Sequence, residues 1–493
     1  MTEPIDAPGS TRGPGRLRRL PARWPTYALL LGSVLVILVG GLILPAAVGT
    51  ADRPGGGATS TTALTAGPPV DHDQRPPAPY ADVPLVTGPS PAAGTTLTAS
   101  DVGVTASAVT IGVVLPSLGS VAAFGVDVSQ LDPKLQQTYW DAAIGRVNAA
   151  GGISGRRLQA VYATGDILSP DSMRAACRTL TEDRPVFTVA NVLGFSGDPI
   201  LCVTKDHATP FIGIDGADPS YYQQSDGRLV TLEPAVPRTL QLFLERVGSE
   251  LAGHTVGVLH PGGAPGLESG TLRAALLAHG AKAVIDGPLG DQDPLIVSGQ
   301  VAGAERRMQQ AGADVVVLLT NAVYATVFAT QADQSRFTPT YLMSDLGYAT
   351  AGDSFLANMP ASFFRRALAE TTTEVGRGRS NLPESALDAG CRHAYEQASG
   401  RLVARDSADG AAAVASCAVV QMITMGLTGA GPNPTRATFS SALARAGSFS
   451  VPGFWRGLLA PGRLDVADEV SLVVGHADCE CYFVADGLRP AGP

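Results

Sequence analysis

The chemistry open to this chain depends first on its six cysteines and seven histidines. The cysteines are Cys177, Cys202, Cys391, Cys417, Cys479 and Cys481. An even number suits disulfide bonds if the protein is exported to an oxidising compartment. The histidines lack the spacing of metal ligands, and the sequence motifs of serine hydrolases, zinc peptidases and phosphate-binding loops are absent. The sequence therefore predicts a protein that is not an enzyme and has no metal or cofactor.

Export is indicated by residues 28–49, which are uncharged and almost continuously apolar. As a helix, this segment would span about 30 Å, the thickness of a bilayer core. Five arginines precede it, and the positive-inside rule then places residues 1–27 in the cytoplasm and the rest of the chain outside. A cleaved signal peptide is the alternative, because Ala47, Gly49 and Ala51 are small residues near a possible cut.

The overall composition predicts a folded extracytoplasmic part on a tether. Of 493 residues, 45% are hydrophobic, so there is ample apolar surface to bury. The net charge of −9 excludes the basic surface that nucleic acid binding requires. Residues 50–105 are rich in Pro, Gly and Thr, which predicts a disordered linker between the membrane segment and the folded part.

From residue 108 the sequence alternates short β-branched runs with amphipathic segments. Val109–Val114 predicts a buried strand, and Asp132-Pro133 predicts the start of a helix, with Asp as N-cap and Pro as first helical residue. A second series of the same kind begins at Thr255. Alternating strands and helices predict an α/β fold with parallel sheets flanked by helices. Two series of similar size predict two lobes.

The predicted lobes and helices indicate which cysteines can form disulfide bonds. Cys177 and Cys202 lie in one predicted lobe, and Cys391 and Cys417 on neighbouring predicted helices, so we predict these two disulfides. Cys479 and Cys481 are separated by one residue. Alternate residues of a strand share a face without favourable disulfide geometry, so no bond is predicted there.

Three segments together carry a family resemblance: Val109–Pro116, Phe124-Gly125, and the string Asn-Ala-Ala-Gly-Gly-Ile-Ser-Gly-Arg at 148–156. They resemble the opening of the leucine/isoleucine/valine-type solute-binding proteins of branched-chain amino-acid ABC transporters. The resemblance implies a two-lobe type I periplasmic-binding-protein fold, here preceded by a single transmembrane helix. It places three crossovers near residues 230–237, 345–352 and 454–458. Lobe 1 would comprise 106–233 and 350–455, and lobe 2 would comprise 234–349 and 456–487.

The resemblance also implies a ligand site between the lobes. The matching positions are Phe124, Phe195, Ser196, Asp215, Ala217, Tyr324 and Asp345. In the family, such positions supply an aromatic contact, small or hydroxyl loops for a ligand carboxylate, and an acid for its ammonium; Asp345 matches that acid. Each position also has a structural interpretation, because aromatic residues pack in cores and Asp residues cap turns.

Two departures from the family pattern affect the ligand. Pro265 stands where the family has an aromatic ring, and Asp215 brings negative charge to where a ligand carboxylate would approach. The ligand is therefore expected to be either an amino acid or a cationic, amide or polyol compound. The predicted function is extracytoplasmic capture of a small, amino acid-like solute for an ABC importer permease. The alternative is a membrane-tethered sensor or envelope-complex module that transports nothing.

Overall fold

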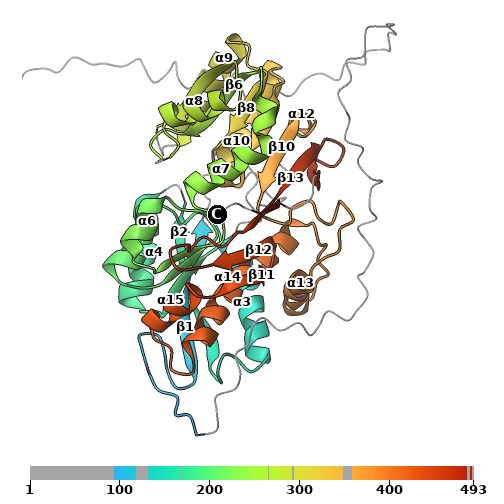
Figure 1. Cartoon of the computed structure of the whole chain (residues 1–493). Coiled ribbons are helices and arrows are strands. Elements are labelled where there is room, and N and C mark those ends of the chain that lie inside the picture. The colour runs from blue at the N-terminus through green and yellow to red at the C-terminus, as the bar shows by residue number, and fades with distance from the viewer. Residues whose placement is uncertain are drawn as a thin grey trace, which may run out of the picture. The chain divides into compact units, whose positions relative to one another are not determined.

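The computed structural model describes residues 94–117, 132–167, 169–264, 266–290, 294–347, 358–485 and 489–490. The predicted membrane segment at 28–49 and Phe124 lie outside these residues. The described chain forms two lobes, each built on its own sheet (Figure 1). One helix, α14 (Ala408–Ala430), is long and apolar enough to cross a membrane, but most of it is buried, which is typical of a core helix.

Lobe 1 contains a five-stranded, entirely parallel sheet in the order β2-β1-β3-β4-β5. Its strands are β1 (Ala108–Ser117), β2 (Arg157–Asp166), β3 (Thr188–Asn191), β4 (Phe211–Gly213) and β5 (Leu229–Thr231). Its helices are α3 (Pro133–Ala149), α4 (Pro170–Arg178), α5 (Asp198–Leu201), α6 (Pro219–Ser225), α13 (Ala386–Ser399), α14 and α15 (Arg436–Leu443), with the hairpin β11 (Gly447–Val451) and β12 (Phe454–Leu459). The predicted N-cap of α3 is confirmed, since Asp132 accepts from the N–H groups of Lys134 and Leu135.

Lobe 2 contains the second sheet, in the order β14-β13-β10-β9-β8-β6-β7, with β15 paired to β13. Its strands are β6 (Thr255–Pro261), β7 (Ala283–Leu289), β8 (Val315–Leu318), β9 (Thr340–Met343), β10 (Ala367–Thr371), β13 (Glu469–His476), β14 (Cys481–Val484) and β15 (Arg489–Pro490). Its helices are α7 (Val236–Val247), α8 (Ser269–Ala278), α9 (Pro294–Gln310), α10 (Ala322–Ser335) and α12 (Ala361–Phe364). Strands β6 to β10 pair in parallel, and β13 and β14 are antiparallel.

The chain crosses between the lobes after β5, after β10 and after β12. The second and third crossovers differ from the predicted positions, 345–352 and 454–458. Because β10 pairs with β9 and β13, residues 367–371 still belong to lobe 2. Because β12 pairs with β11, it leaves lobe 1 only after residue 459. Residues 358–371 therefore contribute to lobe 2 and 456–459 to lobe 1, contrary to the predicted boundaries.

Hydrogen bonds fix each of the three crossovers at the junction of the lobes. The N–H of Thr231 donates to Leu464, and the N–H of Val466 donates back to Thr231 (3.1 and 2.8 Å). The N–H of Glu374 donates to the carbonyl of Gly453 at 2.8 Å. These bonds link the first crossover to the third, and the second crossover to the β11–β12 turn of lobe 1.

The folded part begins earlier than the predicted linker boundary at residue 105. Arg156, only 1% exposed, donates to the carbonyls of Thr98 (2.9 Å) and Thr105 (2.7 Å) and to the side chain of Asn433 (3.0 Å). It also donates to the carbonyl of Pro432. These bonds hold the segment before β1 against the loop between α14 and α15.

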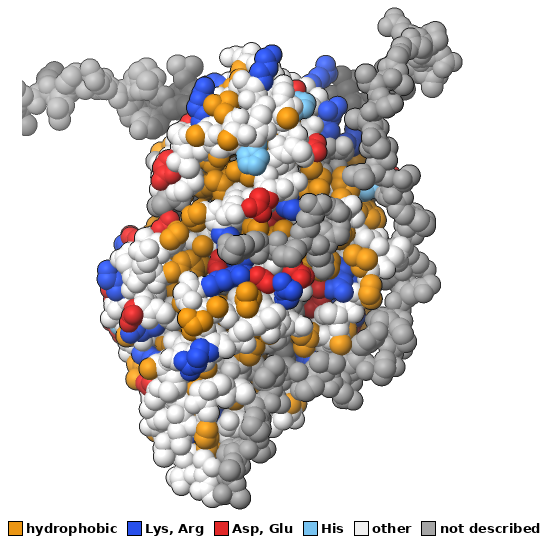
Figure 2. Space-filling model, in the orientation of Figure 1, with side chains coloured by type: hydrophobic (Ala, Val, Ile, Leu, Met, Phe, Trp, Pro, Cys, Tyr) orange, Lys and Arg blue, Asp and Glu red, His pale blue; other side chains and the backbone are white. Residues whose placement is uncertain are grey.

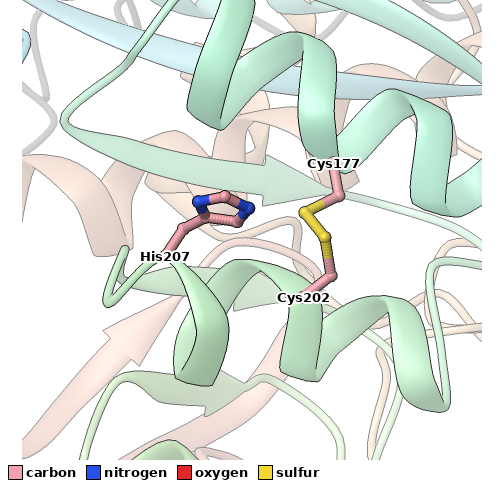
Figure 3. A group of neighbouring side chains, drawn as sticks. All are labelled: Cys177, Cys202 and His207. Atoms are coloured by element: carbon pink, nitrogen blue, oxygen red, sulfur yellow. A yellow bond between two sulfur atoms is a disulfide. The ribbon is translucent and has the colours of Figure 1, made fainter. Parts of the chain in front are cut away.

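Both predicted disulfides are confirmed, Cys177–Cys202 and Cys391–Cys417. Cys479 and Cys481 are also bonded, contrary to the prediction. The reason is that Cys479 lies in a turn, with Glu480 at φ 50°, and only Cys481 belongs to a strand. Figure 3 shows His207 beside Cys177–Cys202, and its Nε2 lies 3.1 Å from Glu182 Oε1.

Candidate ligand-binding site at the lobe junction

The carboxyl ends of the lobe 1 strands lie at the junction with lobe 2. Val192 and Leu193 follow β3 directly, and both pack against the hydrophobic core of lobe 2. Ile214 follows β4, and Glu233 follows β5 by two residues. Ligands bind beyond the carboxyl ends of strands in parallel sheets, so this junction is where a ligand site is expected. In Figure 2, acidic and basic side chains gather at the level where the lobes meet.

Four carboxylates from both lobes form a group that we call the acidic seam: Asp215, Glu233, Asp345 and Glu370. Asp215 and Glu233 come from lobe 1 loops, Asp345 from the short 3-10 helix after β9, and Glu370 from β10. Glu233, Asp345 and Glu370 are at most 5% exposed. Buried carboxylates of like charge are costly unless protons, hydrogen bonds or cations compensate them.

Backbone and hydroxyl donors stabilise part of the seam. Asp215 Oδ2 accepts from the N–H of Gly194 at 2.7 Å, and Glu233 Oε2 accepts from the N–H of Gly216 at 3.3 Å. Asp345 Oδ2 accepts from the hydroxyls of Thr371 (3.2 Å) and Thr372 (2.7 Å) and from the N–H of Thr372. In contrast, neither carboxylate oxygen of Glu370 has a hydrogen-bond partner among the described residues.

Burial raises the pKa of three of these carboxyl groups. It raises the pKa of Asp215 from 3.8 to about 7, although the N–H of Gly194 acts in the opposite direction. The pKa of Glu233 is well above its ordinary value because of burial and of the nearby Asp345 and Asp215. The pKa of Glu370 is also well above its ordinary value, through burial and Asp345, while Arg246 opposes the shift. The seam therefore favours a positive charge or bound protons.

The pKa of Asp215 predicts how stability depends on pH. Between pH 3.8 and about 7 the folded protein keeps a proton that the unfolded chain releases, so the free energy of unfolding falls as pH rises through this window. We expect the Tm to decline from pH 5 to pH 8, and to decline less steeply in Asp215→Asn, which retains the acceptor for Gly194. Differential scanning calorimetry measures both slopes. The exposed Asp183→Asn is the control; an unchanged slope in Asp215→Asn would contradict the prediction.

Beside the seam lies a cavity of about 170 Å³, which we call the hinge cavity. Its lining comes from the loops after β3, β4 and β5, from the second crossover, from the start of α13 and α14, and from the β11–β12 turn. Glu233 belongs both to this lining and to the seam. The lining combines charged side chains with an apolar wall that includes Val192, Ile214, Val414 and Phe454.

Of the predicted site residues that the structure describes, some lie at the acidic seam or at the surface, and the others are buried in the cores of the lobes. Asp215 and Asp345 meet in the seam, and Ser196 is exposed before α5. Phe195 is 1% exposed and its ring stacks on Phe211 in the lobe 1 core, so its predicted ligand contact is not retained.

Two further predicted residues are buried. Ala217, 6% exposed, packs in the same lobe 1 core as Phe195. Tyr324, 8% exposed, packs in the core of lobe 2 at the start of α10. Neither is brought to the hinge cavity. We therefore do not carry Ala217 and Tyr324 into the proposed site.

Sequence reasoning missed Glu233 and Glu370. Glu233 lies inside the first crossover, whose position was predicted. An acidic residue within 230–237 could therefore have been recognised as a candidate for the ligand site. Glu370 carried no such signal, because its strand was not predicted. One group of described residues has the geometry to hold a metal ion, Cys177, Cys202 and His207, but the disulfide occupies both sulfurs (Figure 3).

No family model and no curated protein matches the sequence. Solved structures do match. A solute-binding protein of an ABC transporter from Rhodopseudomonas palustris, in complex with 3,4-dihydroxybenzoic acid, is 15% identical with a TM-score of 0.59, over 78% of this chain and 98% of that one. The chain has the type I periplasmic-binding-protein fold.

Two more structures show the range of proteins that share this binding-protein fold. The branched-chain amino acid transporter substrate-binding protein LivJ from Streptococcus pneumoniae, in complex with isoleucine, is 15% identical with a TM-score of 0.57, over 78% of this chain and 100% of that one. A fatty acid ABC transporter substrate-binding protein from Thermomonospora curvata is 15% identical with a TM-score of 0.58, over 81% and 96%. These three proteins differ in ligand class, so the binding-protein fold alone does not specify a ligand.

Proposed function

We propose that this protein binds a small polar solute between its two lobes, outside the cytoplasm, and presents it to the permease of an ABC importer. One observation carries the proposal: carboxyl groups from both lobes meet at the junction where three crossovers connect the lobes. Hinge closure around a ligand is the motion that such an arrangement supports. The structural neighbours, described as substrate- or solute-binding proteins of ABC transporters, support the same function.

We further propose that residues 28–49 hold the protein at the membrane and that residues 50 to about 95 tether the lobes to it. The apolar length of the first segment and the Pro, Gly and Thr content of the second support this arrangement. Among the described residues, Thr96 is already bonded to the folded part, since its carbonyl accepts from the Asn433 amide at 3.0 Å.

The full-length protein tests the function directly. Calorimetry against amino acids, organic amines, aromatic acids, fatty acids and polyols should find one class that binds. Small-angle scattering with that ligand should then show a smaller radius of gyration than without it, because the lobes close. A flat response across all classes would count against solute capture and favour the envelope-module alternative.

A further inference from the structure

The charges around the hinge cavity are unequal. Five carboxyl groups line it, and two guanidinium groups: Glu233, Glu374, Glu384, Asp388 and Asp406, with Arg379 and Arg405. Two of the five carboxyl groups have their own partners just outside the lining, since Glu374 pairs with Arg377 and Glu384 with Arg392. The remaining three carboxyl groups face two arginines, so the lining keeps an excess of acidic over basic groups.

The excess is concentrated at Glu233. The carboxyl groups of the other three seam residues lie near Glu233: Asp215, Asp345 and Glu370. The two lining arginines come from other segments, where Arg379 donates to the carbonyl of Asp406 (3.1 Å) and Arg405 to that of Leu382 (2.7 Å). A positive group that enters the cavity is therefore most stabilised beside Glu233.

One carboxylate oxygen of Glu233 accepts no hydrogen bond from the residues that the structure describes. It is 5% exposed, and only its Oε2 is bonded, to the N–H of Gly216. Within the described part of the chain, its Oε1 has no hydrogen-bond partner. A carboxylate oxygen that has no donor and keeps accessible surface, in an otherwise buried residue that lines a cavity, is the complement of an N–H donor on a ligand.

The volume of the cavity and its apolar walls limit which ligand can supply that N–H donor. A cavity of roughly 150 Å³ accommodates a molecule of the size of benzene, and the hinge cavity has about 170 Å³. Val192, Ile214 and Phe454 contribute apolar surface to the lining. A bare metal ion would leave this surface uncovered, and the seam carboxylates are not among the groups of described residues that converge closely enough to hold one.

We propose that the hinge cavity binds a small organic amine, with its ammonium group donating to Glu233 and its hydrocarbon part lying against Val192, Ile214 and Phe454. This inference rests on the proposed function and specifies the ligand class for it, at the part of the lobe junction that lobe 1 and the second crossover form. The ligand carries no free carboxylate, because a carboxylate near the ammonium would lie against the acidic seam.

Three probes with a common branched hydrocarbon chain separate the charge requirements. Isoamylamine carries the ammonium alone, leucine carries ammonium and carboxylate, and 4-methylpentanoate carries the carboxylate alone. Titration calorimetry on the full-length protein should give the order isoamylamine, then leucine, with no binding of 4-methylpentanoate. Glu233→Gln should weaken isoamylamine binding about 10- to 100-fold, the usual effect of losing a hydrogen bond to a charged group.

Two controls keep this test decisive. Glu233→Gln retains an acceptor for Gly216 and removes a buried acid, so it should fold with a Tm at pH 8 no lower than that of the wild type. Glu250→Gln removes the same charge from an exposed position and should leave amine affinity unchanged.

Several results would overturn the amine assignment: leucine binding at least as tightly as isoamylamine, unchanged amine affinity in Glu233→Gln, or a response to calcium or magnesium chloride without any response to the amine. In each case, lobe closure with another solute would leave the proposed function standing. No closure with any class of solute would remove the proposed function itself.

Discussion

Replacing Arg156 by methionine should lower the free energy of unfolding by about 3–5 kcal/mol, the size expected when a buried charged donor is removed from several acceptors. The guanidinium is 1% exposed and holds the carbonyls of Thr98, Thr105 and Pro432. Methionine fills a similar volume but donates no hydrogen bond, so these carbonyls, which belong to exposed residues, lose their partner in the protein. Urea denaturation followed by circular dichroism measures the loss.

The neighbouring arginine provides a matched control for this prediction. Arg157 is exposed, and no bond of its side chain is recorded among the described residues. Arg157→Met should therefore change stability by less than about 0.5 kcal/mol, as is usual at the surface. If Arg156→Met were as stable as Arg157→Met, the segment before β1 would not depend on this clamp. Limited proteolysis should also cut the Arg156→Met protein near residues 96–105 sooner than the wild type.

Removing the Cys391–Cys417 disulfide should destabilise the protein by about 3.5 kcal/mol on the chain-entropy model. The bond closes a loop between residues separated by 26 positions and joins α13 to α14 within the core of lobe 1. The double variant Cys391→Ala/Cys417→Ala should therefore show a clearly lower Tm in scanning calorimetry. The loss of buried side-chain volume adds to this effect, because both cysteines are at most 2% exposed.

Removing the Cys479–Cys481 bond provides a comparison for the effect of removing Cys391–Cys417. Its two residues are separated by only 2 positions, and the same model assigns such a small loop about 1.6 kcal/mol. Cys479→Ala/Cys481→Ala should accordingly be the less affected of the two double variants. The reverse order would show that loop closure does not control these contributions. Six free thiols in the intact mass of the native protein would contradict all three bonds.

The sequence by itself predicted the features that depend on local patterns. The Val-rich run of β1 and the Asp132-Pro133 start of α3 were recognisable because strand periodicity, N-capping and the fixed φ of proline act within a few residues. The alternation of such segments was enough to predict parallel sheets. The pairing of Cys391 with Cys417 followed from two neighbouring helices and is confirmed.

The tertiary structure decided where the chain changes lobes and which acids meet. The segment Ala-Leu-Ala-Glu-Thr of β10 contains residues that favour helices, and it is a strand because β9 and β13 pair with it on either side. That pairing buries Glu370 and sets the second crossover after Thr371. Glu233 and Glu370 lie far apart in the chain, and only the packing of two lobes brings their carboxyl groups together. Local periodicity carries no information about such distant pairings, whereas the burial they produce determines the charge of the cavity.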